Sequence, residues 1–470
     1  MHQFPRHTQY KDSGLAWVGE IPAHWQTRRN RFLFREVDRR STHGKETHLS
    51  MSQVHGLVPS NDLGRKSLQS ENYAGGKLVE EHDLVLNRLK AHLGVFARAK
   101  QAGVVSPDYT VLRPKGGVSV RYCESLFKTP MYVGEFRRRT KGIVEGFWRL
   151  YTDDFYNVSA LLPPPEEQDQ IVAYLRGQDA HIARFIKAKR DLIALLAEQK
   201  QTVIEGAVTK GLDAAAAKRD SGIDWIPLIP AHWETCKLKH IAVFNPSRSE
   251  SAALRLSDEA VSFLPMECIT TDGKLQNVET RRTTEVWEGY TYFRRNDVVM
   301  AKITPCFENG KGGLLDALPT EIGFGTTEFI VLRAAARRVR PAFLAKLLSI
   351  KTFRILGAEA MTGAAGQQRV PLDFVKNFRV ALPPLDEQDQ ILSTLQTATA
   401  EQDAAIERIR SEIALIREYR DRLITDVVTG QVDVRGWQPG PDDVASDEEL
   451  TALGDDEADT ADEEEADGDE

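Results

Sequence analysis

The sequence predicts an α+β protein in which two similar mixed α/β domains alternate with two long helices that pair as a coiled coil. Two repeats support this fold class. The string LLPPPEEQDQI at 161–171 returns as ALPPLDEQDQI at 381–391, an offset of 220 residues, and each copy precedes a long stretch without proline. The string KDSGLAWVGEIPAHW at 11–25 returns as RDSGIDWIPLIPAHW at 219–233, an offset of 208 residues. The chain therefore contains one unit twice, made of a motif, a variable body and a long helix.

Each proline-free stretch is expected to form one helix, because start and stop signals stand at its ends. Glu166 and Glu167 follow a proline at the start, where acidic side chains favour the helix dipole. Gly211 follows the end, a common terminating position for glycine. The corresponding residues of the second copy are Asp386, Glu387 and Gly430. Each helix would span roughly 43 residues, or about 65 Å at 1.5 Å per residue.

Apolar residues recur along both stretches at steps of three and four, as a coiled-coil seam requires. They are Ile182, Ile186, Ile193, Leu196 and Val203 in the first helix, and Ile406, Ile409, Ile413, Ile416 and Leu423 in the second. We expect each helix to pair with the other, since pattern and length agree. The alternative is two unrelated amphipathic surface helices, which leaves the ungapped offset unexplained.

The composition is that of a globular protein, with 470 residues and 41% hydrophobic content, enough for two or three domains. No apolar run approaches the roughly 20 residues of a membrane span, and the N-terminus has no signal-peptide core, so a cytoplasmic location is expected. The cysteines show neither metal-knuckle nor disulfide-framework spacing, and the sequence indicates no metal site. They are Cys123, Cys236, Cys268 and Cys306.

The net charge of −8 averages two opposite regions. Residues 439–470 contain 16 Asp or Glu and no Lys or Arg, so the chain without them carries +8. The dense like charge predicts a disordered acidic tail over 438–470. Such a tail is either a solubility appendage or a segment that competes with a polyanion for basic surfaces.

The two variable bodies share a pattern of strands followed by helices. The predicted strands are 83–91 and 108–114 in the first body, and 297–303 and 328–334 in the second; the predicted helices are 120–139 and 341–356. Similar scaffolds with different loops are expected when two modules recognise different ligands. The repeated motif, with two tryptophans and a proline, predicts an irregular segment that packs its aromatic side chains. We interpret its His24 and His232 as structural.

From Tyr10 to Trp437 the sequence resembles the DNA specificity subunit of type I restriction-modification enzymes. Besides the two repeats, the resemblance includes VTKGLD at 208–213, VTGQVDVR at 428–435, NRLKA at 87–91, GVVSPDYTVLRP at 103–114, KITPCFENGKGG at 302–313 and GFGTTEF at 323–329. The order and duplication of these strings, more than any one of them, make the match specific.

The resemblance implies an internal pseudo-twofold repeat whose helices pair antiparallel. It implies two target-recognition domains at 1–160 and 214–380, a central helix region at 161–213 and a distal one at 381–437. Each domain would read one half of a bipartite, asymmetric DNA site. The helices would set the spacing and dock two modification subunits, which bind S-adenosylmethionine and methylate adenine. Two restriction subunits would add ATP- and Mg-dependent translocation and cleavage. The chain itself would hold no cofactor and no catalytic centre.

Two other functions remain open: a stand-alone DNA methyltransferase or nuclease, and a coiled-coil scaffold that binds DNA without sequence preference. The first is disfavoured because no phosphate-binding GxxxxGK[ST] occurs. The GKGG string at Gly310 lacks the hydroxyl, and Asn245-Pro246-Ser247 falls short of the Asn-Pro-Pro-aromatic string of amino-methyltransferases.

Candidate DNA-binding residues are basic and amide side chains in loops, because lysine and arginine bind phosphates and amides can pair with base edges. In the first body they are Asn87, Arg88, Lys90, Arg137, Arg138, Arg139, Lys141 and Arg149; in the second they are Lys302, Thr304, Asn309, Lys311, Gln367, Gln368 and Arg369. The alternative for Arg137–Arg139 is the solvated end of a helix. Because the two helices are expected to have equal length, we also predict half-sites about one DNA turn apart, near 34 Å from centre to centre.

Overall fold

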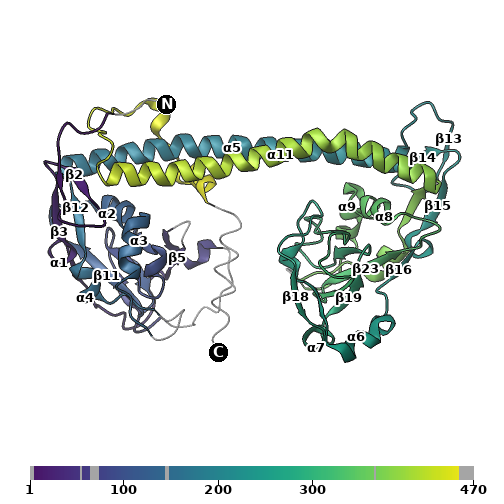
Figure 1. Cartoon of the computed structure of the whole chain (residues 1–470), viewed down its shortest axis with the longest axis horizontal. Coiled ribbons are helices and arrows are strands. Elements are labelled where there is room, and N and C mark those ends of the chain that lie inside the picture. Colours follow the sequence, from purple (N-terminus) through teal and green to yellow (C-terminus); the bar gives the residue numbers. More distant parts are fainter. Residues whose placement is uncertain (1–4, 53–55, 64–72, 143–147, 365–366, 455–470) are drawn as a thin grey trace. The chain divides into compact units, whose positions relative to one another are not determined.

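A computed structural model describes residues 5–52, 56–63, 73–142, 148–364 and 367–454 (Figure 1). The chain forms two compact units, one of residues 1–192 with 409–470 and the other of residues 193–408. Both long helices pass through both units. Within the described ranges, no helix has an apolar stretch of the length needed to cross a membrane.

The first unit is built around a four-stranded antiparallel sheet in the order β4-β11-β8-β9. Its strands are β1 Tyr10–Asp12, β2 Glu20–Pro22, β3 Gln26–Arg29, β4 Phe34–Glu36, β5 Leu49–Ser52, β6 Gly56–Pro59, β7 Lys77–Val79, β8 Leu84–Asn87, β9 Phe96–Arg98, β10 Gly103–Val105, β11 Tyr109–Pro114 and β12 Ser159–Leu162. Its short helices are α1 Asn30–Leu33, α2 Val120–Phe127, α3 Pro130–Arg137, α4 Thr152–Asn157 and α12 Asp447–Leu450. Aromatic side chains of the sheet and of α2, α3 and α4 form one core.

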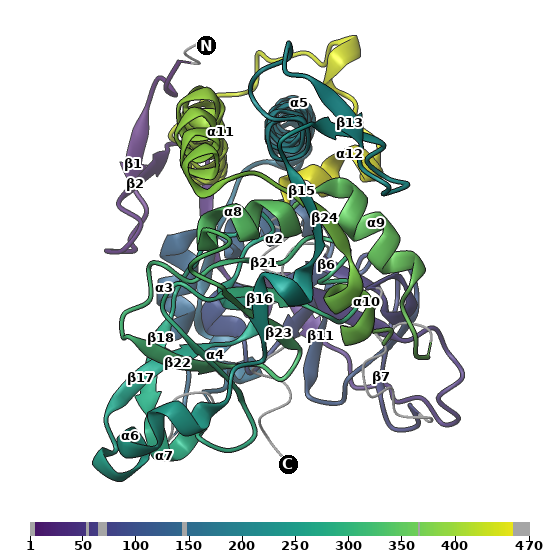
Figure 2. The same cartoon turned by 90° about the vertical axis from the view of Figure 1, so that its right-hand side faces the viewer.

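The second unit repeats this sheet in the order β16-β23-β20-β21 and adds a second sheet, β18-β17-β22-β19. Its strands are β13 Lys218–Asp220, β14 Leu228–Pro230, β15 Glu234–Lys237, β16 Ala242–Phe244, β17 Ala260–Leu264, β18 Glu279–Arg282, β19 Thr291–Arg294, β20 Val298–Ala301, β21 Gly312–Leu314, β22 Ile322–Gly325, β23 Phe329–Ala334 and β24 Arg379–Leu382. Its short helices are α6 Ala252–Ser257, α7 Thr283–Val286, α8 Pro341–Leu348, α9 Lys351–Glu359 and α10 Leu372–Asn377. Helices α8 and α9 lie between the long-helix segments of this unit and the repeated sheet (Figure 2).

A buried aspartate–arginine ion pair occurs at the same place in the repeated sheet of both units. Arg113 donates from Nε and Nη2 to the two carboxylate oxygens of Asp83, at 2.9 and 3.0 Å. Arg333 donates in the same way to Asp297, at 2.7 and 2.8 Å. Both aspartates are 1% exposed, so each charge is buried with a bidentate partner, as a buried carboxylate requires. The two bodies therefore share one scaffold, as their strand pattern predicted.

The two long helices are α5, Pro165–Lys210, and α11, Leu385–Val428. In the first unit, Asp179 of α5 accepts two hydrogen bonds from Arg420 of α11, at 2.6 and 3.1 Å, and Lys189 lies 2.7 Å from Glu412. Partner numbers rise along α5 as they fall along α11, so the helices pair antiparallel. In the second unit, Lys200 donates to Asp403 at 2.5 Å.

The predicted seam residues are buried or half-buried, as the seam of a coiled coil requires. Ile182, Ile186, Ile406, Ile409 and Ile413 are buried. The half-buried remainder of the predicted set is Ile193, Leu196, Val203, Ile416 and Leu423. The alternative of unrelated surface helices is wrong, because surface helices would not pair their seams.

Three local predictions need correction. The helix expected over 120–139 is broken into α2 and α3, because Pro130 stands at the first position of α3 and the residue before a proline leaves helical geometry. The helix expected over 341–356 is likewise divided, at Ser349 and Ile350. The repeated motif is also more regular than expected, since β1 pairs with β2 and β13 with β14 as short hairpins.

The predicted disorder of the tail is wrong for residues 438–454, which form short helical turns against α5. His181 donates from Nε2 to Asp443 at 2.7 Å, and Arg184 donates to the carbonyl oxygens of Asp442 and Val444. Arg190 donates to Gly454 O at 2.9 Å. Cations on α5 thus offset the acidic charge that predicted disorder. Residues 455–470 lie outside the described part of the chain.

Candidate nucleic-acid interface

The repeated motif and the repeated EQ dipeptide bind each other in both units. Trp25, which is fully buried, donates from Nε1 to Glu167 Oε1 at 3.0 Å, and His24 Nε2 lies 2.6 Å from Glu167 Oε2. In the second unit, Trp233 donates to Glu387 Oε1 at 3.0 Å and His232 Nε2 lies 2.7 Å from Oε2. This arrangement, which we call the clamp, ties the motif to the first turn of a long helix. Both histidines thus take part in the joint between motif and helix.

The glutamine that follows each clamp glutamate binds the N-cap of an earlier helix of the same unit, α2 or α8. Gln168 accepts the backbone N–H of Ser119, the N-cap of α2, at 2.8 Å and donates to Pro163 O at 2.9 Å. Gln388 accepts the N–H of Arg340, the N-cap of α8, at 2.8 Å and donates to Pro383 O at 2.9 Å. Both glutamines are fully buried, so each EQ pair is a structural joint between the recognition module and the long helix.

In the second unit, two predicted DNA-binding segments meet just beyond β20. Thr304 N–H donates to Gln368 O at 2.9 Å, and Gln368 N–H donates to Thr304 Oγ1 at 3.1 Å. Val370 N–H donates to Lys302 O at 2.8 Å. Gln367 and Arg369 are exposed, while Lys302 and Thr304 are half-buried. We call Lys302, Thr304, Gln367, Gln368 and Arg369 the second cluster.

The first unit gathers its candidates in the corresponding place, beyond β8. Leu150 N–H donates to Arg88 O at 3.1 Å, the counterpart of the bond from Val370 to Lys302. Arg149 and Lys141 exchange two backbone hydrogen bonds, of 2.9 and 3.0 Å, as Arg369 and Thr362 do at 2.9 and 3.1 Å. Residues 143–147, between the two basic residues, lie outside the described part. We call Asn87, Arg88, Lys90, Lys141 and Arg149 the first cluster.

In each unit, an acidic residue binds one arginine of the cluster. It stands just before β11 in the first unit and just before β23 in the second. Glu328 accepts from Arg369 Nε and Nη2, at 3.0 and 2.6 Å, and these bonds lower the pKa of the glutamate. At the corresponding position in the first unit, Asp108 accepts with its carbonyl oxygen from Arg88 Nε at 2.6 Å, and its carboxylate lies 3.9 Å from Arg88 Nη2. Each guanidinium is thereby held in one orientation.

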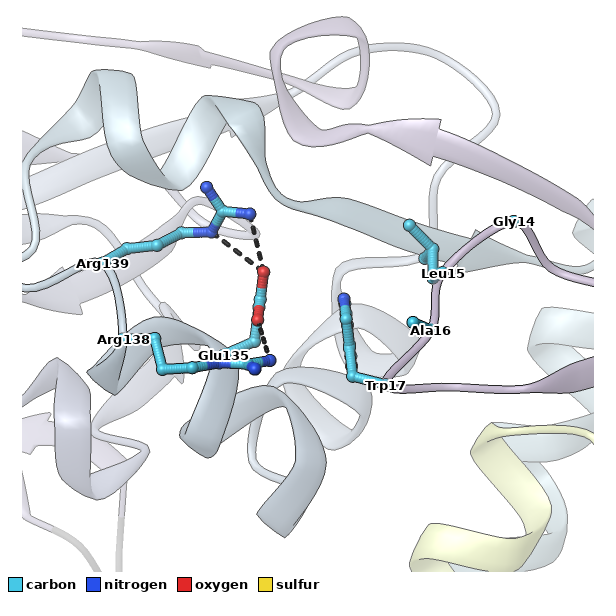
Figure 3. Close-up of a pocket in the computed structure, with 7 residues that line it drawn as sticks. All are labelled: Gly14, Leu15, Ala16, Trp17, Glu135, Arg138 and Arg139. Atoms are coloured by element: carbon cyan, nitrogen blue, oxygen red, sulfur yellow. Dashed lines mark hydrogen bonds and ion pairs between the residues drawn. The ribbon is translucent and has the colours of Figure 1, made fainter.

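Arg138 and Arg139 are not in the first cluster. Both donate to the buried carboxylate of Glu135, and with Trp17 they line a hollow of about 440 Å³ beside the motif loop (Figure 3). Trp17 packs edge-on against Tyr132 with ring centres 4.8 Å apart. These arginines therefore lie at the joint between α3 and the motif. Arg138, at the C-cap of α3 with a side chain that is 64% exposed, also fits the alternative of a solvated helix end.

Arg137 does reach the first cluster, because its guanidinium lies 5.6 Å from the centre of the Trp148 ring, next to Arg149 in the chain. In the second unit, Asn309 is exposed in the turn after β20, whereas Lys311 is directed inward and donates from Nζ to Met266 O at 3.3 Å. The structure thus brings together most, but not all, of the predicted candidates.

Sequence reasoning missed the acids Asp108 and Glu328 and the joint-forming Gln168 and Gln388. A signal for all four existed, since each pair obeys the 220-residue offset of the long helices. Arg149 and Arg369 obey it as well. Adding 220 to the number of each first-unit residue gives its counterpart in the second unit, so the sequence alone identifies these pairs.

Comparison with known proteins agrees with this architecture. The family model for the type I restriction modification DNA specificity domain matches residues 230–415. The specificity subunits of the Escherichia coli type I restriction enzymes EcoEI and EcoAI are 38% identical over 170 residues and 39% over 168. Each alignment covers 35% of this chain and 27% of the relative, so the chain spans about a quarter of the length of these relatives.

Two further likenesses extend along most of the chain. The MjaVIII specificity subunit of Methanocaldococcus jannaschii is 23% identical over 386 residues, which cover 76% of this chain and 81% of that protein. A solved structure, from work on assembly and conformational transition of the type I restriction-modification system, matches 88% of this chain and 99% of its own, with a TM-score of 0.54 and 13% identity. At that identity the likeness concerns the fold.

Residues 230–415 are thus a DNA specificity domain of the type I restriction-modification class, set on a fold of two modules and two long helices. The relatives matched over part of the chain are specificity subunits of type I restriction enzymes, and the likeness in fold extends over most of it.

Proposed function

We propose that this chain selects the DNA sequence on which a type I restriction-modification complex acts. Each cluster contacts one half of a bipartite, asymmetric site. Lysine and arginine bind the phosphates, and the exposed Gln367 and its neighbours face base edges, because a glutamine amide can pair with adenine through two hydrogen bonds. The observation that carries the proposal is the same backbone joint, from Leu150 to Arg88 and from Val370 to Lys302, beneath a basic loop in both modules.

The proposed partners follow from the same assignment. The antiparallel helices set the unread gap between the half-sites and dock two modification subunits, and two restriction subunits complete the assembly. Adenine methylation with S-adenosylmethionine and ATP- and Mg-dependent cleavage belong to those partners, and this chain is the non-catalytic member. The complex works in the cytoplasm, where it meets the DNA.

The test is to map methylated adenines in the host genome with and without this gene. We expect deletion to remove methylation from one bipartite motif and to leave other motifs unchanged. Complementation with an Arg149→Ala or Arg369→Ala variant should relax opposite halves of that motif. Unchanged methylation in the deletion strain would reject the proposal.

Purified chain distinguishes the two alternatives. A stand-alone enzyme would bind S-adenosylmethionine and transfer methyl groups without partners, whereas we expect neither. A non-specific scaffold would shift all DNA equally in the presence of the modification subunit, with strong salt dependence and no preference for the mapped motif.

A further inference from the structure

The first clamp contains a third titratable side chain that the second clamp lacks. His7 is 6% exposed and lies beside His24, with ring centres 5.4 Å apart. Its Nε2 is 3.9 Å from Glu167 Oε1, while His24 Nε2 is 2.6 Å from Glu167 Oε2. One ligand atom from each of the three residues lies within 4.8 Å of the other two. Two imidazoles and a carboxylate thus converge on one point.

The spacing of these atoms suits a small transition-metal ion. In a tetrahedral zinc site with bonds of about 2.0–2.1 Å, neighbouring ligand atoms are about 3.4 Å apart. His24 Nε2 lies 2.6 Å from Glu167 Oε2 and His7 Nε2 lies 3.9 Å from Glu167 Oε1, on either side of that value. With one ligand atom from each residue within 4.8 Å of the others, modest rotations of the side chains would bring all three to bonding distance of one ion. Two histidines and a glutamate with an open fourth position are a ligand set that zinc uses with water.

The surroundings also match those of a metal site. Glu167 keeps one oxygen hydrogen-bonded to the indole N–H of Trp25, which fixes the carboxylate. On the far side of the His7 ring, Nδ1 is 3.7 Å from an Asp433 oxygen. That buried Nδ1 has no hydrogen-bond partner among the described residues. A carboxylate behind the second ring nitrogen is the usual outer partner of a metal-bound histidine, because it fixes the tautomer that presents Nε2.

The second clamp provides an internal comparison. Its Trp233, His232 and Glu387 repeat the first clamp within 0.1 Å, and by the offset of the motif Ala215 stands where His7 does. The joint between motif and helix therefore needs no third imidazole. His7 is an addition that the architecture does not explain.

We propose that His7, His24 and Glu167 bind one zinc ion, with water as the fourth ligand. His24 then presents Nε2 without its proton, which moves to Nδ1, and the hydrogen bond between His24 and Glu167 is replaced by two bonds to the metal. The ion fastens the N-terminal segment to the first turn of α5 and, through Asp433, to the link after α11. Its role is structural and separate from the two clusters.

The test uses the untagged full-length chain, stripped of metal with a chelator and titrated with Co²⁺ as a spectroscopic substitute for zinc. We expect one equivalent to give the intense visible absorption of a four-coordinate ion, and one equivalent of Zn²⁺ to abolish it. Thermal denaturation should show a rise of a few degrees with excess zinc, because the ion binds only the folded site.

Matched variants locate the site. His7→Ala and the more conservative His7→Gln should lose both the absorption and the zinc-dependent rise in Tm, whereas His232→Ala in the second clamp should keep both. The rise in Tm is the difference between samples of one variant with and without zinc, so a change in that variant's own stability does not affect it. Absence of the Co²⁺ absorption in the natural chain, or its retention in both His7 variants, would overturn the proposal.

Discussion

The two units share a framework and differ in what is attached to it. The clamp, the EQ joint, the buried aspartate–arginine pair and the bond beneath each cluster recur with nearly equal distances. The second unit carries the additional sheet β18-β17-β22-β19, where the described part of the first has two-stranded β5-β6 and β7-β10. The restraint on the cluster arginines differs too, since Asp108 holds Arg88 and Glu328 holds Arg369. The shared framework therefore places both clusters in the same way, while the strands and loops around them differ.

Shortening both long helices should have the largest effect on how the two units act together. Deleting seven residues from each, 193–199 and 404–410, removes about 10 Å of helix and preserves helical phase within about 20°. The Lys189–Glu412 and Lys200–Asp403 pairs remain in the chain. We expect the methylated motif to keep both half-sites and to lose its original gap in favour of a shorter one. An unchanged gap would mean that the helices do not set the spacing.

Replacing a clamp tryptophan is the point substitution from which we expect the largest loss of stability. Trp25 and Trp233 are 0% and 1% exposed, and replacing such a side chain by alanine costs about 3–5 kcal/mol. We expect Trp25→Ala and Trp233→Ala to lower the free energy of unfolding by similar amounts in urea denaturation. A loss below about 1 kcal/mol in one of them would show that the two clamps are not equivalent.

Removing one arginine from each cluster should weaken DNA binding by a smaller amount. Arg149→Ala and Arg369→Ala should each cost about 1–3 kcal/mol if the arginine reads a base, and each should relax a different half-site. Competition binding with oligonucleotides mutated in one half at a time measures this. A uniform loss over all sequences, with a salt slope reduced by about one, would assign the arginine to a phosphate instead.

The smallest expected effect concerns the restraining acid. Glu328→Gln removes an ion pair that is partly exposed, so DNA affinity should rise by less than about 1 kcal/mol as Arg369 is released. Asp108→Asn keeps the bond from Arg88 to the backbone carbonyl and removes only a carboxylate 3.9 Å away, so its effect should be smaller still. Titration of each variant with DNA at low salt measures the change in affinity. A reduced affinity would indicate that the acid positions the arginine for base contact.

The same pair has a defined pH dependence. Because Arg369 lowers the folded pKa of Glu328, the pair adds stability above the ordinary glutamate pKa and loses it as the pH falls through the lowered value. Urea denaturation of the natural chain and of Glu328→Gln should therefore converge as the solution becomes acidic. Curves that stay parallel through the acidic range would indicate that the pair contributes nothing to stability.

The long helices, their seams, the duplication and the central strands could all be predicted from the amino-acid sequence. These features are encoded locally: prolines and acids start each helix, glycine follows it, and apolar residues repeat with the period of the element. The prediction of long α5 and α11 was confirmed for this reason. The break at Pro130 was equally readable from local rules and was overlooked.

Only the tertiary structure decided which side chains meet. Glu167 and Trp25 lie 142 residues apart in the chain, and no periodicity links them. Arg138 and Arg139 were candidate DNA ligands in the sequence, and the fold places Glu135 and Trp17 beside them. His7 acquires its neighbours only because the segments around residues 7 and 433 both reach the start of α5. Hydrogen bonds and ion pairs act over a few ångströms of space, so their partners follow from how the chain packs and not from distance along it.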